Sequence, residues 1–226
     1  MVKNTFLSFS ILLGLALFAT GCASDKSGAN TGPTTAKAGQ VPSLPKGVSL
    51  RRDNDIQGIW LSPGLNFTNY DTMYVADTEF KAVERSNEVK NRASAITSVQ
   101  EKFVHALREA GLFKKVVMDT NGLAADGRTL KMYNTIIEFE KGGGAARYWA
   151  GLYGAGQPVI KVRGLVYDGD KLVFVFEARR SGESAGARVA GVFMSDIEIQ
   201  ENDIRDLTGD VANCMRRVSG LKDLNK

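Results

Sequence analysis

A serine flanked by glycines is the motif of this chain that most resembles a reactive site. Residues 182–186 read Gly-Glu-Ser-Ala-Gly, which matches the G-x-S-x-G pattern of a hydrolase nucleophile elbow. Such a serine needs a histidine base, and in α/β-hydrolases that histidine follows the serine in the chain. The single histidine, His105, precedes it, and no capped helix pattern follows Gly186. We therefore expect Ser184 to lie in a small-residue turn, without hydrolase activity.

The remaining candidate residues give equally little sign of catalysis. His105 has no second histidine or thiol nearby, so a zinc site lacks its usual donors. Cys214 falls on an apolar helical stripe, where a buried and inert thiol is the usual outcome. Acidic residues near the start of that helix favour its N-terminal dipole; they are Asp196, Glu198, Glu201 and Asp203. We expect no catalytic residue, no metal and no cofactor, and hence no enzyme.

Glycines and aromatic residues are mixed in residues 142–156, which read GGGAARYWAGLYGAG. A phosphate-binding loop needs Lys-Ser/Thr after its glycines and then a helix, whereas Pro158 and a strand-like segment follow here. The segment is therefore not predicted to bind a nucleotide. We expect it to be an interaction surface, because aromatic residues commonly dominate interface energetics; its alternatives are contact with a membrane or with the domain's own core. The residues of this surface are Arg147, Tyr148, Trp149 and Tyr153.

The first residues of the chain have the pattern of an export signal. Lys3 supplies a positive charge, and an apolar run extends from Phe6 to Ala19. Small residues follow this run, as they do before a signal cleavage site. The run is shorter than the roughly 20 apolar residues that a membrane-spanning helix needs. The N-terminus therefore predicts export, with residues 1–21 as a cleaved signal peptide.

The end of this signal adds a more specific prediction. Residues 19–22 read Ala-Thr-Gly-Cys, which resembles the lipobox of bacterial lipoproteins. The resemblance implies that Cys22 carries acyl chains such as palmitate on its thiol and its new amino terminus. No aspartate follows it at Ala23 or Ser24, which in Gram-negative bacteria implies sorting to the outer membrane. The alternative is an ordinary secretory signal with a chance cysteine.

Composition divides the rest of the chain into a tether and one domain. Residues 22–50 are rich in Ser, Gly, Thr, Ala, Pro and Lys, and such a segment buries too little apolar surface to offset its ordering entropy. We expect it to be a flexible, lipid-anchored tether. Residues 51–226 are long enough to form a single domain with a sizeable core. With Cys22 lipidated, only Cys214 remains, so no intramolecular disulfide is expected.

Hydrophobic periodicity predicts the elements of this domain. Two amphipathic helices are indicated, over residues 88–110 and around residues 204–221. Their apolar stripes are Val89, Ala93, Ile96, Val99, Phe103, Val104, Leu107 and Ala110, and Ile204, Leu207, Val211, Cys214, Val218 and Leu221. Strands are expected at Thr72–Thr78, Lys115–Met118, Leu130–Glu140, Val159–Tyr167 and Leu172–Arg179, with a hairpin turn at residues 168–170. The result is an α+β domain of two layers, with a mostly antiparallel sheet and two long helices, opening as strand–helix–strand.

The order of these elements around the glycine-rich run resembles two groups of lipoproteins. One is the curli-secretion-channel group, and the other is a family of small bacterial lipoproteins known only as a domain of unknown function. The resemblance covers roughly residues 70–220, and its most specific positions are Gly143, Gly144, Arg147 and Tyr148. In the channel proteins, such segments form membrane hairpins that assemble as a ring. A hairpin of this kind needs two strands of about 9–11 residues each, and residues 142–158 are too few.

These observations lead to one main functional expectation. We expect an outer-membrane-anchored, periplasm-facing lipoprotein that acts as a non-enzymatic protein-binding or assembly factor in the cell envelope. It would either bind a protein partner or self-assemble. The alternative is a subunit of an oligomeric secretion channel. A net charge of +4, from 29 Lys and Arg against 25 Asp and Glu, is too small and too evenly spread to predict nucleic-acid binding.

Overall fold

The computed structural model describes five parts of the chain, namely residues 43–82, 89–123, 128–140, 158–182 and 196–222. The helices in these parts are α1 (Val89–Ala110) and α4 (Asp196–Val218), with short 3-10 turns η1 (Phe67–Asn69) and η2 (Thr120–Gly122). The strands are β1 (Gly58–Leu61), β2 (Thr72–Val75), β3 (Glu79–Phe80), β4 (Lys115–Val117), β5 (Thr129–Glu140), β6 (Val159–Asp168) and β7 (Lys171–Arg180). The fold is α+β, as the sequence predicts.

Both helices occupy the expected stretches of sequence. In α1 the buried residues are Ala95, Val99, Phe103, Val104, Ala106, Leu107 and Ala110. The predicted member Ala93 is exposed instead. The helix ends before Gly111, whose φ of 63° fits the predicted glycine cap. In α4 the stripe from Ile204 to Cys214 is buried, but Leu221 lies beyond the helix and is exposed, which corrects the predicted C-terminal end.

The sheet is mixed, so the prediction of a mostly antiparallel sheet was wrong. Its strand order is β1-β7-β6-β5-β2-β4, and β3 also pairs with β5. The pairs β1·β7, β7·β6 and β6·β5 are antiparallel, whereas β2·β4, β2·β5 and β3·β5 are parallel. The cause is the strand–helix–strand opening itself, because a strand that returns through a helix pairs parallel to the first.

The hydrophobic pattern failed to predict one strand and gave another strand the wrong end. The predicted strand at Thr72–Thr78 ends at Val75, and a separate two-residue strand, β3, follows it. No strand was predicted at Gly58–Leu61, where β1 forms one edge of the sheet. In contrast, the β6–β7 hairpin turns where expected, with Gly169 at a φ of 56° between the paired residues Asp168 and Lys171.

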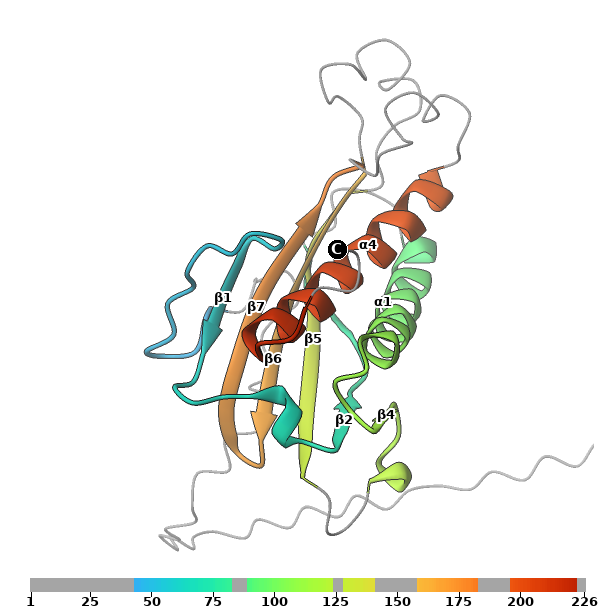
Figure 1. Ribbon diagram of the computed structural model, residues 1–226. Helices are drawn as coiled ribbons and strands as arrows, with labels where there is room; N and C mark the ends of the chain where they lie inside the picture. The colour runs from blue at the N-terminus through green and yellow to red at the C-terminus, as the bar shows by residue number, and fades with distance from the viewer. Residues whose placement is uncertain (1–42, 83–88, 124–127, 141–157, 183–195, 223–226) are drawn as a thin grey trace, which may run out of the picture. The chain divides into compact units, whose positions relative to one another are not determined.

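One side of the sheet and the two helices share a single apolar core. Figure 1 shows α1 and α4 lying beside one another along the strands. Every second side chain of β6 and β7 points to the same side of the sheet. Among these, Val162 and Phe176 belong to the same core cluster as Phe103 of α1 and Leu207 of α4. The helices are also joined directly, since Ser98 donates a hydrogen bond to Glu201 at 2.8 Å. The two helices therefore depend on each other and on the sheet.

A glycine in β6 makes room for the central ring of this core. Gly164 is paired with Phe176 across β6 and β7, and a Cβ atom at Gly164 would lie 2.0 Å from Cε1 of that ring. On the ring rests Phe103 of α1, with ring centroids 5.7 Å apart. The missing side chain thus lets the ring lie against the sheet backbone, and α1 packs on top of it.

We expect Gly164→Ala to destabilise the fold, because the ring of Phe176 must move away from the new methyl group. Overpacking of this kind costs about 1–3 kcal/mol of unfolding free energy, which urea denaturation measures. The control is Gly209→Ala in α4, where nothing lies within 4 Å of the added Cβ; it should stabilise by up to about 1 kcal/mol, since alanine is the better helix former. Equal stability of the two variants would contradict the close contact at Gly164.

Candidate functional site

The edge strand β1 borders a hollow in the described residues. On one side β1 pairs with β7 along its whole length. On the other side Arg51 pairs with Ile59, and their backbones exchange hydrogen bonds of 2.9 and 2.8 Å. Before Arg51 the chain makes a turn, in which Val48 donates to the carbonyl of Pro45. Among the described residues, no backbone pairs with Leu61 on this outer edge of β1.

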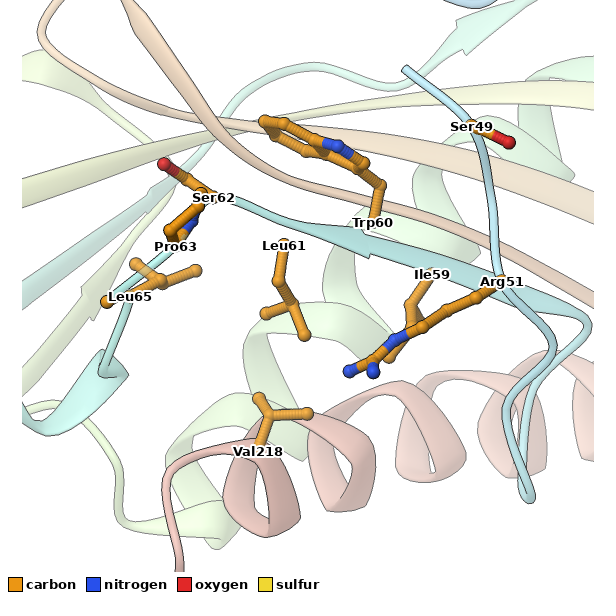
Figure 2. Close-up of a pocket in the computed structure, with 10 residues that line it drawn as sticks. Ser49, Arg51, Ile59, Trp60, Leu61, Ser62, Pro63, Leu65 and Val218 are labelled. Carbon is orange, nitrogen blue, oxygen red and sulfur yellow. The ribbon is translucent and has the colours of Figure 1, made fainter.

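A pocket of about 390 Å³ lies beside the end of β1. Figure 2 shows Leu61 of β1 and Val218 of α4 pointing toward one another across it, whereas Trp60 points away to the other side of the strand. Alternation along a strand explains that difference. The lining residues are Ser49, Arg51, Ile59, Trp60, Leu61, Ser62, Pro63, Gly64, Leu65 and Val218. We call this the edge pocket.

The edge pocket is lined by a cluster of aliphatic side chains together with Arg51 and two serines, Ser49 and Ser62. Ile59 is buried, and Leu61, Leu65 and Val218 are partly buried against the main core. Arg51 is exposed, and within the described residues no carboxylate forms an ion pair with it. A pocket of this kind has no reacting group, but it can hold an apolar side chain beside an anion.

An ion pair at the end of α4 fixes one wall of the edge pocket. Arg217 donates to both carboxylate oxygens of Asp53 at 2.7 and 2.6 Å, and it also binds Asp55. Burial alone would raise the pKa of Asp53. The hydrogen bonds from Arg217 and from the amides of Asp55 and Ile56 outweigh burial and lower that pKa below its ordinary value. The chain before β1 is thereby held on the helix that carries Val218.

A second contact fixes the chain on the other side of β1. The amide of Phe67 donates to the hydroxyl of Ser219 at 3.2 Å, directly after α4 ends. The Phe67 ring is fully buried and meets Phe174 of β7 edge to face, with centroids 5.3 Å apart. The segment that follows β1 is therefore bound both to the end of α4 and to the sheet.

A second hollow, of about 320 Å³, lies between α1 and α4 and is polar. His105 lines it, but this side chain is 70% exposed, and its Nδ1 lies 3.2 Å from a carboxylate oxygen of Glu109. Asp210 is paired with Arg180, yet burial raises the pKa of Asp210 more than the guanidinium lowers it. The hydroxyl of Thr208 donates to the carbonyl of Arg205 at 2.9 Å. These groups are engaged with one another and do not pair a nucleophile with a base.

The side of the sheet away from the helices carries a buried charge cluster. Glu177 of β7 is 7% exposed; it lies 2.6 Å from Nζ of Lys161 and accepts hydrogen bonds of 2.8 and 2.5 Å from Arg163. Burial favours the neutral acid, but the hydrogen bonds and charges of the two cations lower the pKa of Glu177. A carboxylate held ionised in this way binds β6 to β7 and is a poor proton acceptor.

Only some of the candidate residues chosen from the sequence lie in the described parts of the chain. Cys22, Arg147, Tyr148, Trp149, Tyr153 and Ser184 all lie outside the described residues, so they stay predictions. Cys214 is buried as expected, and burial raises the pKa of its thiol to about 12. In the parts of the chain that are described, no group of three or more His, Cys, Asp or Glu side chains is arranged to hold a metal ion, and no helix is both long and apolar enough to cross a bilayer.

The edge pocket itself was missed by the sequence analysis. One local signal was available, since the short apolar run Ile59–Leu61 stands between Gly58 and the turn residues Pro63 and Gly64, which is typical of a short buried strand. No local signal connects this run to Val218, because that contact joins opposite ends of the domain.

Comparison with known proteins places the chain in a family. The family described as "Domain of unknown function (DUF4410)" matches residues 53–196, more than half of the chain. The chain belongs to the DUF4410 family. The matched residues extend from just before β1 to the first residue of α4. Arg51 and Val218, on two walls of the edge pocket, lie outside the DUF4410 match. No curated protein matches the sequence.

Solved structures with a similar chain course show little sequence identity. A PelC dodecamer from Paraburkholderia phytofirmans is 13% identical, with a TM-score of 0.44 over 67% of this chain and 96% of that one. A Xanthomonas campestris protein of the family named DUF330 is also 13% identical, with a TM-score of 0.41 over 71% and 90%. At this sequence identity and TM-score, the similarity does not indicate the function of the DUF4410 chain.

The ion pair beside the edge pocket predicts a pH-dependent stability. Because the pKa of Asp53 is lowered on folding, its contribution is present above the pKa of the unfolded chain and is lost as the pH falls through the folded pKa. We expect Asp53→Asn to cost about 2 kcal/mol of unfolding free energy at neutral pH. The difference from the unaltered protein should shrink between about pH 5 and pH 2.

Urea denaturation at a series of pH values measures this difference. Asp170→Asn is the matched control, since this aspartate is exposed in the β6–β7 turn and should change the unfolding free energy little at any pH. A cost of Asp53→Asn that stays constant down to pH 2 would contradict the role of the ionised carboxylate.

Proposed function

We propose that this DUF4410 protein is a lipoprotein that Cys22 anchors in the outer membrane, facing the periplasm, where it binds a protein partner in building the cell envelope. The signal-like residues 1–21 and the lipobox-like sequence up to Cys22 support the anchoring. The tether-like composition of residues 22–50 fits a domain that stands away from the membrane surface. In this proposal the folded part is a two-layer domain and not an enzyme.

The observation that carries the binding role is the edge pocket. Its apolar walls, formed by Ile59, Leu61 and Val218, adjoin the exposed guanidinium of Arg51. Binding sites commonly combine an apolar hollow with a few polar groups that fix the orientation of what they hold. Residues 142–156 remain a second expected contact surface, through Trp149 and Tyr153.

The anchoring is tested by Cys22→Ser. We expect the variant to lose lipid and to leave the membrane fraction, because the tether has no other apolar anchor and each buried CH₂ of an acyl chain contributes about 0.8 kcal/mol. Labelling of cells with radioactive palmitate, followed by fractionation, measures both effects. Ala23→Ser, next to the lipidation site, is the matched control and should stay labelled. Equal palmitate incorporation in Cys22→Ser would contradict the assignment.

The channel alternative makes a different prediction about size. A protein-binding factor should be a monomer or a small oligomer in detergent, whereas a channel subunit of the curli type should form a large, discrete ring. Size-exclusion chromatography with light scattering on the detergent-extracted, full-length protein measures the mass. We expect a small species, and a single large ring would favour the channel instead.

A further inference from the structure

We propose that the edge pocket takes an extended, acidic segment of a partner protein, which adds as a strand to β1 and places a carboxylate on Arg51. This inference rests on the proposed protein-binding function and names the chemistry of the partner. Three features of the described residues carry it: the direction of the free backbone groups of β1, the apolar hollow beside them, and the unpaired guanidinium.

The backbone of Leu61 faces away from the sheet with its hydrogen-bonding groups unused. Successive residues of a strand direct their N–H and C=O groups to opposite neighbours. Ile59 directs its groups to Arg51, outside the sheet, so Trp60 directs its groups to β7 and Leu61 directs its groups outward again. Among the described residues, no hydrogen bond involves the N–H or C=O of Leu61. A strand laid along this edge would satisfy both groups.

The chain's own preceding residues make no hydrogen bond to Leu61, although Ser49 lines the same hollow. Arg51 pairs with Ile59 at a single bridge, and Leu50 packs its Cβ 3.1 Å from where a side chain of Gly58 would begin. Before this point the chain turns at Pro45–Val48. Within the described parts of the chain, the outer edge of β1 is therefore paired at Ile59 and unpaired at Leu61. Open strand edges are the places where extended peptides add to a sheet.

The hollow beside the open edge fits an apolar side chain of such a strand. Leu61, Leu65 and Val218 are each partly buried against the core yet border the pocket. An added strand directs alternate side chains to the two sides of the sheet. One set would enter the hollow between Leu61 and Val218, which Figure 2 shows facing one another. Backbone pairing would then provide affinity, and the hollow would select the side chain that enters it.

The charge at the rim selects an acidic partner. Arg51 lines the edge pocket and is exposed, with no carboxylate paired to it among the described residues. The nearest acids in sequence, Asp53 and Asp55, are both engaged by Arg217. A guanidinium binds a carboxylate through two parallel hydrogen bonds, which a neutral amide does not reproduce. The partner segment therefore carries Glu or Asp next to its apolar residues.

The test uses labelled peptides and the full-length protein in detergent. The probe is an acetylated and amidated heptapeptide, Thr-Val-Thr-Glu-Thr-Val-Thr, with a fluorophore whose anisotropy reports binding. Matched peptides carry Gln or Lys in place of Glu. We expect the Glu peptide to bind at least about tenfold more tightly than the Gln peptide, since hydrogen bonds between charged groups are stronger than those of a neutral amide, and more tightly still than the Lys peptide.

Two kinds of variant separate the charge from the strand pairing. Arg51→Gln should reduce binding of the Glu peptide to the level of the Gln peptide. Arg52→Gln, the neighbouring arginine that does not line the pocket, should leave it unchanged. N-methylation of the backbone amides on one edge of the peptide should abolish binding, and methylation on its other edge should not, because a strand added at Leu61 uses one edge only.

The outcomes distinguish this inference from the proposed function. Equal affinities for the Glu, Gln and Lys peptides, the absence of binding by all three, or indifference to methylation on either edge would each overturn it. A protein that is lipidated at Cys22 and recovers a partner, yet binds none of the peptides, would leave the proposed function standing and overturn only the strand addition. Selective binding of the Glu peptide, together with equal palmitate incorporation in Cys22→Ser and the unaltered protein, would support the inference and contradict the anchoring.

Discussion

The contact between the Phe176 ring and the backbone of Gly164 is the constraint on which the packing of this domain depends. Without a Cβ atom at Gly164, the ring lies against β6, and Phe103 of α1 rests on it. Phe174 lies 5.8 Å from the same ring and in turn meets Phe67 beyond β1. Each fully buried phenylalanine contributes about 1.5–3 kcal/mol. The same row of rings therefore joins the helices, the centre of the sheet and its β1 edge.

The elements with a strong local pattern could be predicted from the sequence, and those made by distant contacts could not. The apolar stripes of α1 and α4 and the alternation of β6 repeat within a short stretch, so periodicity locates them. The parallel pairing of β2 with β5 has no such local signal, because the sequence of neither strand specifies which strand it pairs with. In β5 the register shifts between Ile136 and Glu138, which interrupts the alternation that a pattern would follow.

The same distinction applies to the candidate sites. The glycine and aromatic run at residues 142–156 attracts notice because its composition is unusual, and it lies outside the described residues. The edge pocket has ordinary residues, and it becomes a site only because Arg51, Leu61 and Val218 meet in space. The sequence also does not show which charges are paired. Glu177 lies between two cations, whereas no ion pair of Arg51 is formed within the described residues.

The position of β1 has a consequence for the order in which the chain can fold. This N-terminal strand pairs in the sheet with β7, and the residues before it are bound by Arg217, 164 residues away from Asp53. Contacts of such long range close large loops, and the entropy of closure must be met before any contact is gained. While a ribosome still holds the C-terminal part of the chain, β1 has no β7 to join and its apolar residues stay available to other molecules. The sheet edge that we assign to partner binding thus cannot be completed before β7 and the end of α4 have been synthesised.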